Sequence, residues 1–301
     1  MARVISLLPA ATDIVATLGA ADTLVGVTHE CDFPADVVRR LPRVTGSPIE
    51  GATAVEIDRQ VREAAQQGAS LFELHEAEMR TLRPELLLTQ ALCDVCAVNE
   101  TDVRAIAARM QPAPRVVTLS GTTFDTVFAD IAQVAGALGI PEVGETVIAT
   151  LWRRLRFVHE TLRASAAPRP RVAVLEWTDP IYAAGHWVPE MIARAGGVDV
   201  LSVPGTHSTT RTVDAVRDAA PEVLCIAPCG YNVARAIVEV EALLARPEWR
   251  WARELSVWIL NGNVLTSRPG PRIVDGVEVV AAVLHPALFA APSPEYANRL
   301  I

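Results

Sequence analysis

Residues 3–8 (RVISLL) and residues 171–176 (RVAVLE) both have the pattern of a buried strand that begins at an arginine. The two halves of the chain continue in the same order: strand, helix, glycine turn, strand, helix, Pro-Glu, strand. This repeated order predicts two similar α/β lobes on one chain. Two further pairs of stretches match in the same order: 19–27 with 196–203, and 84–88 with 221–225.

Strand-length apolar runs alternate with helical patterns along the chain. This alternation is typical of α/β architecture, in which helices connect parallel strands. The predicted fold class is therefore α/β, with a parallel sheet in each lobe. The strands are expected near residues 3–8, 23–27, 86–90 and 115–119 in the first lobe, and near 171–176, 199–203, 223–227 and 257–260 in the second, where 263–266 could continue the last strand.

The stretch between the two repeats is predicted to be one long helix. Residues 142–165 contain no proline, and apolar residues from Val147 to Leu162 recur at spacings of three and four. A helix of this length spans roughly 36 Å. We therefore expect an N-terminal lobe over 1–140 with an insertion at 49–72, a connecting helix over 141–166, and a C-terminal lobe over 167–301.

The charge balance argues against a nucleic-acid partner. Net charge is −8 at pH 7, and the arginines are scattered along the chain. No apolar run approaches the roughly 18 residues that a membrane span needs. The first strand begins at Arg3, which leaves no room for a signal peptide, so a cytoplasmic protein with reduced thiols is expected. A periplasmic or cell-surface location is the alternative if a leader has been removed.

Several motifs resemble one family. Residues 3–13 (RVISLLPAATD), the pair 24–27 (LVGV) and 31–34 (CDFP), residues 82–88 (LRPELLL) and residues 267–272 (SRPGPR) are similar to the substrate-binding proteins of ABC importers for vitamin B12, haem and ferric siderophores. The cobalamin-binding branch is the most similar. The resemblance implies a helical-backbone fold of two lobes, a non-enzymatic role, and an ABC permease as partner.

The resemblance also marks two positions that face the permease. The family carries a glutamate on each lobe there. This chain has Asp214 at one position, and at the other it has Ala77 between Glu76 and Glu78.

Ligands of parallel α/β sheets bind beyond the carboxyl ends of the strands. In the first lobe, this rule points to His29, Glu30 and Cys31. They are expected to contact a ligand through hydrogen bonds or, for His29, as an axial imidazole on a metal. The alternative is a turn in which Asp32 caps the helix that follows.

Aromatic residues are concentrated after the first strand of the second lobe, although aromatic residues make up only 5% of the chain. Flat rings suit a flat macrocycle. The alternative is a small satellite core under the loop. The ligand-binding residues expected in this lobe's loops are Trp177, Tyr182, His186, Trp187 and Tyr231.

Cys93 and Cys96 form a CxxC motif. With Cys31, they are candidate ligands for zinc or iron. The alternatives are a redox dithiol, ordinary packing of small apolar side chains, and contact of Cys93 and Cys96 with the bound ligand.

Arg268 and Arg272 flank Pro269-Gly270-Pro271 before an apolar helix. Two arginines at a helix start can hold a phosphate, and the nucleotide loop of cobalamin has one. The alternative is that one arginine pairs with a surface acid such as Glu278.

No Walker loop, no strand-linked GxGxxG and no GxSxG motif is present. The chain is therefore not expected to be an enzyme. We predict that it binds a cobalamin-like corrinoid in a cleft between the lobes, as a substrate-binding protein or an intracellular corrinoid handler. The alternatives are a metalloprotein using Cys31, Cys93 and Cys96, or a binder of haem or a ferric siderophore.

Overall fold

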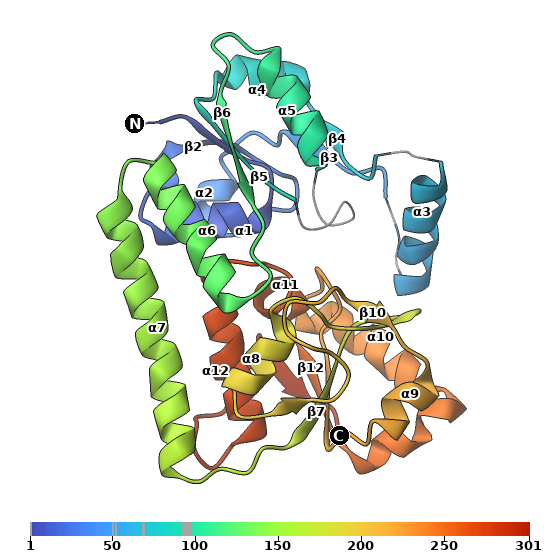
Figure 1. Ribbon diagram of the computed structural model, residues 1–301. Helices are drawn as coiled ribbons and strands as arrows, with labels where there is room; N and C mark the ends of the chain where they lie inside the picture. Colours follow the sequence, from blue (N-terminus) through green and yellow to red (C-terminus); the bar gives the residue numbers. More distant parts are fainter. Residues whose placement is uncertain (1, 50, 52, 68–69, 92–97) are drawn as a thin grey trace. The chain divides into compact units, whose positions relative to one another are not determined.

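The computed structural model describes residues 2–49, 51, 53–67, 70–91 and 98–301. The chain divides into two compact units (Figure 1). The division falls within one continuous helix, α7 (Pro141–Ala164), where the sequence predicted a helix over 142–165. Unit 1 comprises Met1–Ala52, Glu56–Gly121 and Asp125–Thr150, and unit 2 comprises Thr53–Val55, Thr122–Phe124 and Leu151–Ile301.

Unit 1 is built on a four-stranded parallel sheet with the order β2-β1-β5-β6. All five residues of β5 are buried, as is typical of a strand in a parallel sheet covered on both faces. The elements before α7 are β1 (Val4–Ser6), α1 (Pro9–Thr17), the 3-10 helix η1 (Ala21–Thr23), β2 (Leu24–Val27), α2 (Ala35–Val38), β3 (Thr45–Gly46), α3 (Ala54–Gln66), β4 (Glu73–Leu74), α4 (Glu76–Leu82), β5 (Leu86–Gln90), α5 (Glu100–Ala108), β6 (Arg115–Leu119) and α6 (Phe124–Ala137).

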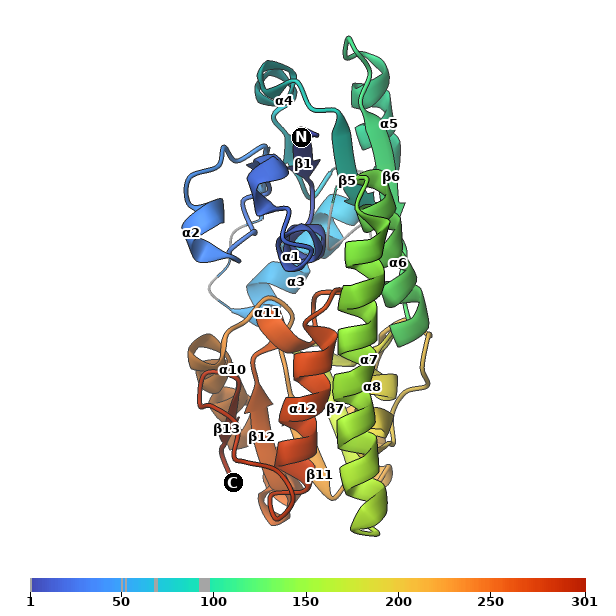
Figure 2. The ribbon, with the colours of Figure 1, turned by 90° about the vertical axis from the view of Figure 1, so that its left-hand side faces the viewer.

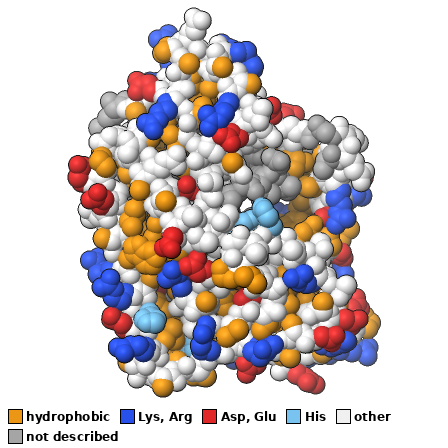
Figure 3. All heavy atoms as spheres, in the orientation of Figure 1, with side chains coloured by type: hydrophobic (Ala, Val, Ile, Leu, Met, Phe, Trp, Pro, Cys, Tyr) orange, Lys and Arg blue, Asp and Glu red, His pale blue; other side chains and the backbone are white. Residues whose placement is uncertain are grey.

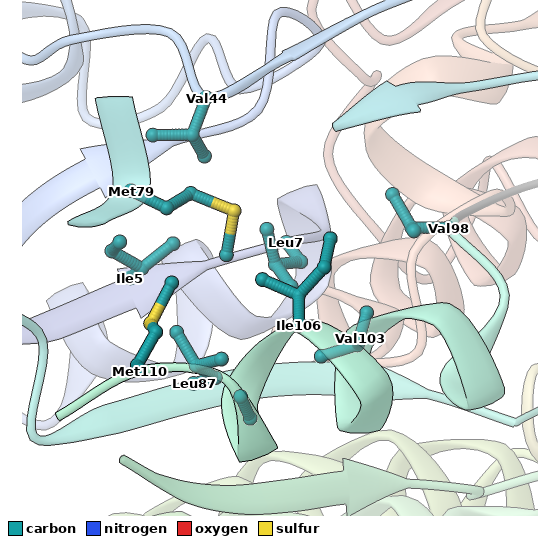
Figure 4. Packing of buried hydrophobic residues seen from close by; sticks show 10 residues of the cluster. Ile5, Leu7, Val44, Met79, Leu87, Val98, Val103, Ile106 and Met110 are labelled. Carbon is teal, nitrogen blue, oxygen red and sulfur yellow. The ribbon is translucent and has the colours of Figure 1, made fainter. Parts of the chain in front are cut away.

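A core of aliphatic and methionine side chains holds α5 and α4 on this sheet. Ile5 of β1, Leu87 of β5 and Met79 of α4 are fully buried, and Ile106 of α5 points into the same cluster (Figure 4). Fully burying each such side chain stabilises the fold by about 1.5–3 kcal/mol. Asn99 is the N-cap of α5, and its side chain accepts a hydrogen bond from the Thr101 amide.

Unit 2 has a seven-stranded sheet. Its centre, β7-β11-β12, is parallel, whereas β8 and β13 pair antiparallel at the two sides. Its elements after α7 are β7 (Arg171–Thr178), β8 (Ile181–Ala183), α8 (Val188–Arg194), β9 (Val198–Asp199), β10 (Thr209–Thr210), α9 (Val213–Asp218), β11 (Val223–Ile226), α10 (Val233–Ala245), the 3-10 helix η2 (Pro247–Glu254), β12 (Ser256–Leu260), α11 (Gly262–Leu265), α12 (Ile273–Leu284) and β13 (Ala297–Arg299).

Two strand predictions and one loop prediction in this unit were wrong. Residues 263–266 belong mostly to the helix α11, because the Asn261 side chain caps it by accepting from the Val264 amide. The strand expected over 199–203 is only β9, after which Asp199 turns the chain with its side chain. The segment after residue 176 was expected to be a loop. It instead contains the last two residues of β7 and the hairpin strand β8.

Helix α7 packs beside α12 in unit 2, as Figure 2 shows. Leu151, Leu155 and Val158 of α7 are buried at spacings of four and three. Arg154, on the same helix, pairs with Asp275 and Glu278 of α12, both at 2.6 Å. The ion pairs of Arg154 therefore join α7 to α12, while the apolar stripe of α7 is buried.

Acidic and basic side chains are interspersed on the face drawn in Figure 3, in keeping with an ordinary solvated surface. Within the described ranges, none of the helices has the length and apolar character needed to span a membrane.

Candidate functional site

The carboxyl ends of β7, β11 and β12 meet at one edge of the unit 2 sheet, because these strands are parallel. Trp177, near the end of β7, and Tyr231, in the loop after β11, lie there with ring centroids 5.6 Å apart in an edge-to-face arrangement. Tyr182 of β8 lies opposite Trp177 in the antiparallel ladder. The structure thus brings together three of the aromatic residues that the sequence predicted for the site.

Arg235, in the first turn of α10, covers this group from one side. Its guanidinium carbon lies 3.8 Å from the centroid of the Tyr231 ring, and its Nη2 donates to the Tyr231 hydroxyl at 3.1 Å. Burial raises the pKa of the Tyr231 phenol, and the nearby Arg235 charge opposes that rise only in part. The phenol is therefore neutral at physiological pH, and the group is an aromatic surface with one cation on it.

The loop after β12 meets the same edge. The Asn263 amide donates to the Tyr231 carbonyl at 3.1 Å, and the Gly230 amide donates to Ser267 Oγ at 3.2 Å. Arg268 is 4% exposed, and its Nη2 donates to Asn263 Oδ1 at 2.7 Å. Arg268 is therefore linked to Tyr231 through two hydrogen bonds, one to the Asn263 side chain and one from the Asn263 amide.

Arg272 lies further along that loop, at the N-cap of α12. Its Nε is 4.0 Å from Asp275 Oδ2. Glu278, the acid considered as an alternative partner, instead pairs with Arg154.

His186 and Trp187 form a second group in unit 2. Their rings are 5.8 Å apart, and the His186 ring is 5.2 Å from that of His207. Trp187 is 6% exposed and begins α8, so most of its ring packs inside the unit. None of the ring contacts among the described residues joins this group to Trp177.

In unit 1, the loop after β2 carries His29, Glu30 and Cys31. Thr45 on β3 lies 2.8 Å from His29 Nδ1 and also accepts from the His29 amide at 3.2 Å. Partial burial, and then the charge of Arg43, lower the pKa of His29. The imidazole is thus neutral at pH 7, the form that ligates metals.

Cys31 is buried and packs against α1. Its Sγ lies 3.1 Å from Thr12 Oγ1 and 3.2 Å from Thr28 Oγ1. Arg43 donates to the carbonyls of Thr28 and Cys31 at 2.8 and 2.9 Å, which fixes the turn. Glu30 is exposed beside it. The N-cap of α2 is Pro34, which makes no side-chain capping hydrogen bond.

The other two candidate metal ligands, Cys93 and Cys96, lie outside the described residues. Within the part of the chain that the structure describes, no group of three or more His, Cys, Asp or Glu side chains is arranged to hold a metal ion.

Asp214 and Glu76, which the resemblance places at or beside the family's two glutamate positions, both form ion pairs within the chain. Asp214 lies 2.9 Å from Arg217. Glu76 pairs with Arg80 at 2.6 Å and with Arg109 at 2.7 Å. These hydrogen bonds, with that to Arg109 the stronger, lower the pKa of Glu76 to about 2.

Sequence reasoning missed Arg235, Asn263 and His207. Arg235 has a local signal, since it lies four residues after Tyr231 and next to the Asn232 helix cap. Asn263 and His207 reach their partners only through the folding of separate loops, so no short-range pattern marks them.

The chain matches no protein-family model. It is 25% identical to a vitamin B12-binding protein of Vibrio cholerae over 289 residues, which cover 94% of this chain and 88% of that protein. A periplasmic haem-binding protein from Pseudomonas aeruginosa has a similar structure, with a TM-score of 0.74 and 20% identity over 99% of this chain and 97% of that one. The periplasmic vitamin B12-binding protein of Vibrio cholerae has a TM-score of 0.64 and 22% identity, over 95% and 97%.

These similarities extend over nearly the whole of each chain compared, and the two solved structures share the α/β fold described above. The resemblance predicted from the sequence motifs is therefore confirmed: the chain is similar in sequence to a vitamin B12-binding protein and in fold to periplasmic vitamin B12- and haem-binding proteins.

Proposed function

We propose that the chain is a non-enzymatic binding protein for a flat, metal-containing macrocycle, with a cobalamin-like corrinoid as the first candidate. The observation that carries this proposal is the aromatic group at the carboxyl edge of the unit 2 sheet. Trp177 and Tyr231 supply ring surface, and the buried Arg268 lies next to them. Apolar faces and a few placed polar groups are what a macrocycle with polar substituents requires.

Haem is the second candidate, because a periplasmic haem-binding protein has a similar structure. Its propionates would use the same kind of cation that the cobalamin phosphate would use. On the first unit, His29, Glu30 and Cys31 stay proposed contacts. A metal site on Cys31, Cys93 and Cys96 stays a separate proposal, tested by metal analysis of protein purified without chelator.

The proposed partner for delivery is an ABC permease, as the similarity to substrate-binding proteins suggests. That role would place the protein outside the cytoplasm, whereas corrinoid handling inside the cell needs no permease. A pull-down with candidate permeases separates the two roles.

Binding is tested by spectral and calorimetric titration with cobalamin, cobinamide and haem. We expect cobalamin to bind with a dissociation constant of roughly micromolar or tighter. Trp177→Ala should weaken binding at least about tenfold, or about 1.4 kcal/mol, because a half-buried ring that stacks on the ligand is removed. Trp177→Phe keeps a ring and should retain most of the affinity. If the wild-type protein, Trp177→Ala and Trp177→Phe bound cobalamin with equal affinity, the proposed aromatic site would be contradicted.

The two corrinoids also test the arginines. Arg272→Ala should weaken cobalamin more than cobinamide, which lacks the nucleotide phosphate. The fold should survive this change, since Asp275 keeps its 2.6 Å contact with Arg154. Equal losses for both corrinoids would show that Arg272 only holds its loop.

A further inference from the structure

The half of α7 that belongs to unit 2 has a buried face and an exposed face. Leu151, Leu155 and Val158 are buried within the unit, whereas Phe157 is 65% exposed. In Figure 2, this half of the helix runs in front of the other elements of unit 2. One exposed apolar residue is ordinary by itself, so the meaning of Phe157 depends on the side chains around it.

Three arginines share the exposed face with Phe157. Residues three and four apart on an α-helix lie on the same face, and Arg153, Arg156 and Arg163 are related to Phe157 and to Glu160 by these spacings. All five side chains are exposed, and we call them the α7 stripe. At 1.5 Å per residue, the stripe is about 15 Å long.

The α7 stripe is locally positive on an acidic chain. It holds three arginines and one glutamate, whereas the whole chain carries a net charge of −8. Arg156 and Arg163 form no ion pair with any carboxylate among the described residues. Arg154, between them and the buried face, directs its charge to α12 instead. The guanidinium groups of Arg156 and Arg163 are therefore open to an external anion.

We propose that the α7 stripe binds the surface of a membrane that contains anionic phospholipids. Phe157 enters the headgroup layer, and Arg156 and Arg163 bind lipid phosphates. Guanidinium groups pair with phosphate oxygens through two parallel hydrogen bonds. Helices that lie at a membrane surface combine arginines, which attract anionic lipids, with aromatic side chains that enter the interface. The inference goes beyond the proposed function, because no residue of the aromatic group takes part in it.

The form of the α7 stripe favours lipid over a protein partner. Stable protein interfaces bury on the order of 1,000 Å² or more and have several well-packed anchors at their centre. The stripe has one apolar anchor on a convex helix, which small and mobile lipid headgroups can surround. A second copy of the chain is disfavoured, because two such stripes face to face would bring like charges together.

The experiment measures binding of the full-length protein to vesicles of phosphatidylglycerol and phosphatidylcholine in equal parts, with phosphatidylcholine vesicles as reference. We expect binding to the anionic vesicles alone, weakened by added salt because exposed charges are screened. Arg156→Glu together with Arg163→Glu should weaken it about 25-fold or more, since each arginine near an anionic surface contributes about fivefold. Phe157→Ala should weaken it at least about threefold, because the buried ring is lost.

The matched control reverses two exposed arginines of η2, in the change Arg250→Glu together with Arg253→Glu. It alters the net charge equally and should leave vesicle binding nearly unchanged, and circular dichroism checks that each variant is folded. Equal losses in the two double variants would show that only net charge matters and would overturn the inference. So would a protein that does not bind the anionic vesicles, or one that forms a dimer which Phe157→Ala dissociates. Macrocycle titration of the same variants tests the proposed function separately and should give the wild-type affinity.

Discussion

The carboxyl group of Asp199 is largely shielded from solvent, so its charged form lowers the stability of the folded protein. Burial raises its pKa from 3.8 to about 6, against the opposing effects of the Leu201 and Ser202 amides and of Arg211. The folded protein therefore holds this proton more tightly than the unfolded chain does. The stability that results is fully present below pH 3.8 and is lost as the pH rises through about 6.

Asp199→Asn removes that dependence. The amide oxygen can still accept from the Leu201 and Ser202 amides but never becomes charged. The free energy of unfolding at pH 8 should therefore rise by roughly 1–3 kcal/mol, and the two proteins should converge toward pH 4. Urea denaturation across this range measures the effect. A variant that is less stable at pH 8 would show that the charged carboxylate is needed for the turn.

Among the elements, α7 and α12 depend on Arg154. Its guanidinium meets two carboxylates, Asp275 and Glu278, within one turn of α12. Arg154→Ala leaves these like charges adjacent, so we expect a loss of about 1–3 kcal/mol, limited because all three side chains are about one-third exposed. Thermal unfolding measures it, with exposed Arg156→Ala as a control that should cost less than about 0.5 kcal/mol. Equal effects of the two changes, or no reduction of the difference in high salt, would contradict the ion cluster.

The elements also differ in how well the sequence predicts them. The helix α7 was predictable because its apolar stripe is long and uninterrupted by proline, and α9 because Thr212 caps it. Short strands such as β8 and β10 carry too few residues for periodicity to mark them. The apolar pair Val264-Leu265 was assigned to a strand, since a run that short fits either state until the Asn261 cap is recognised.

At the scale of the whole molecule, the repeated order of elements and the family motifs were sufficient for the fold class. The site was only partly predictable. Trp177 and Tyr231 were named because each follows or ends a parallel strand, a rule that holds for this sheet. The pairing of His186 with His207 depends on two main-chain hydrogen bonds between separate loops, which no local pattern encodes.

The loop that carries Tyr231 also carries Cys229, which is exposed, whereas Cys31 and Cys225 are buried. Burial raises the pKa of the Cys225 thiol to about 12, so that thiol does not react in the folded protein. With Cys93 and Cys96 replaced by serine, a maleimide dye would attach at Cys229 alone. Corrins and porphyrins absorb visible light, so ligand arrival would quench the dye by energy transfer. Cys229 is therefore an attachment point for an optical sensor of the proposed macrocycle.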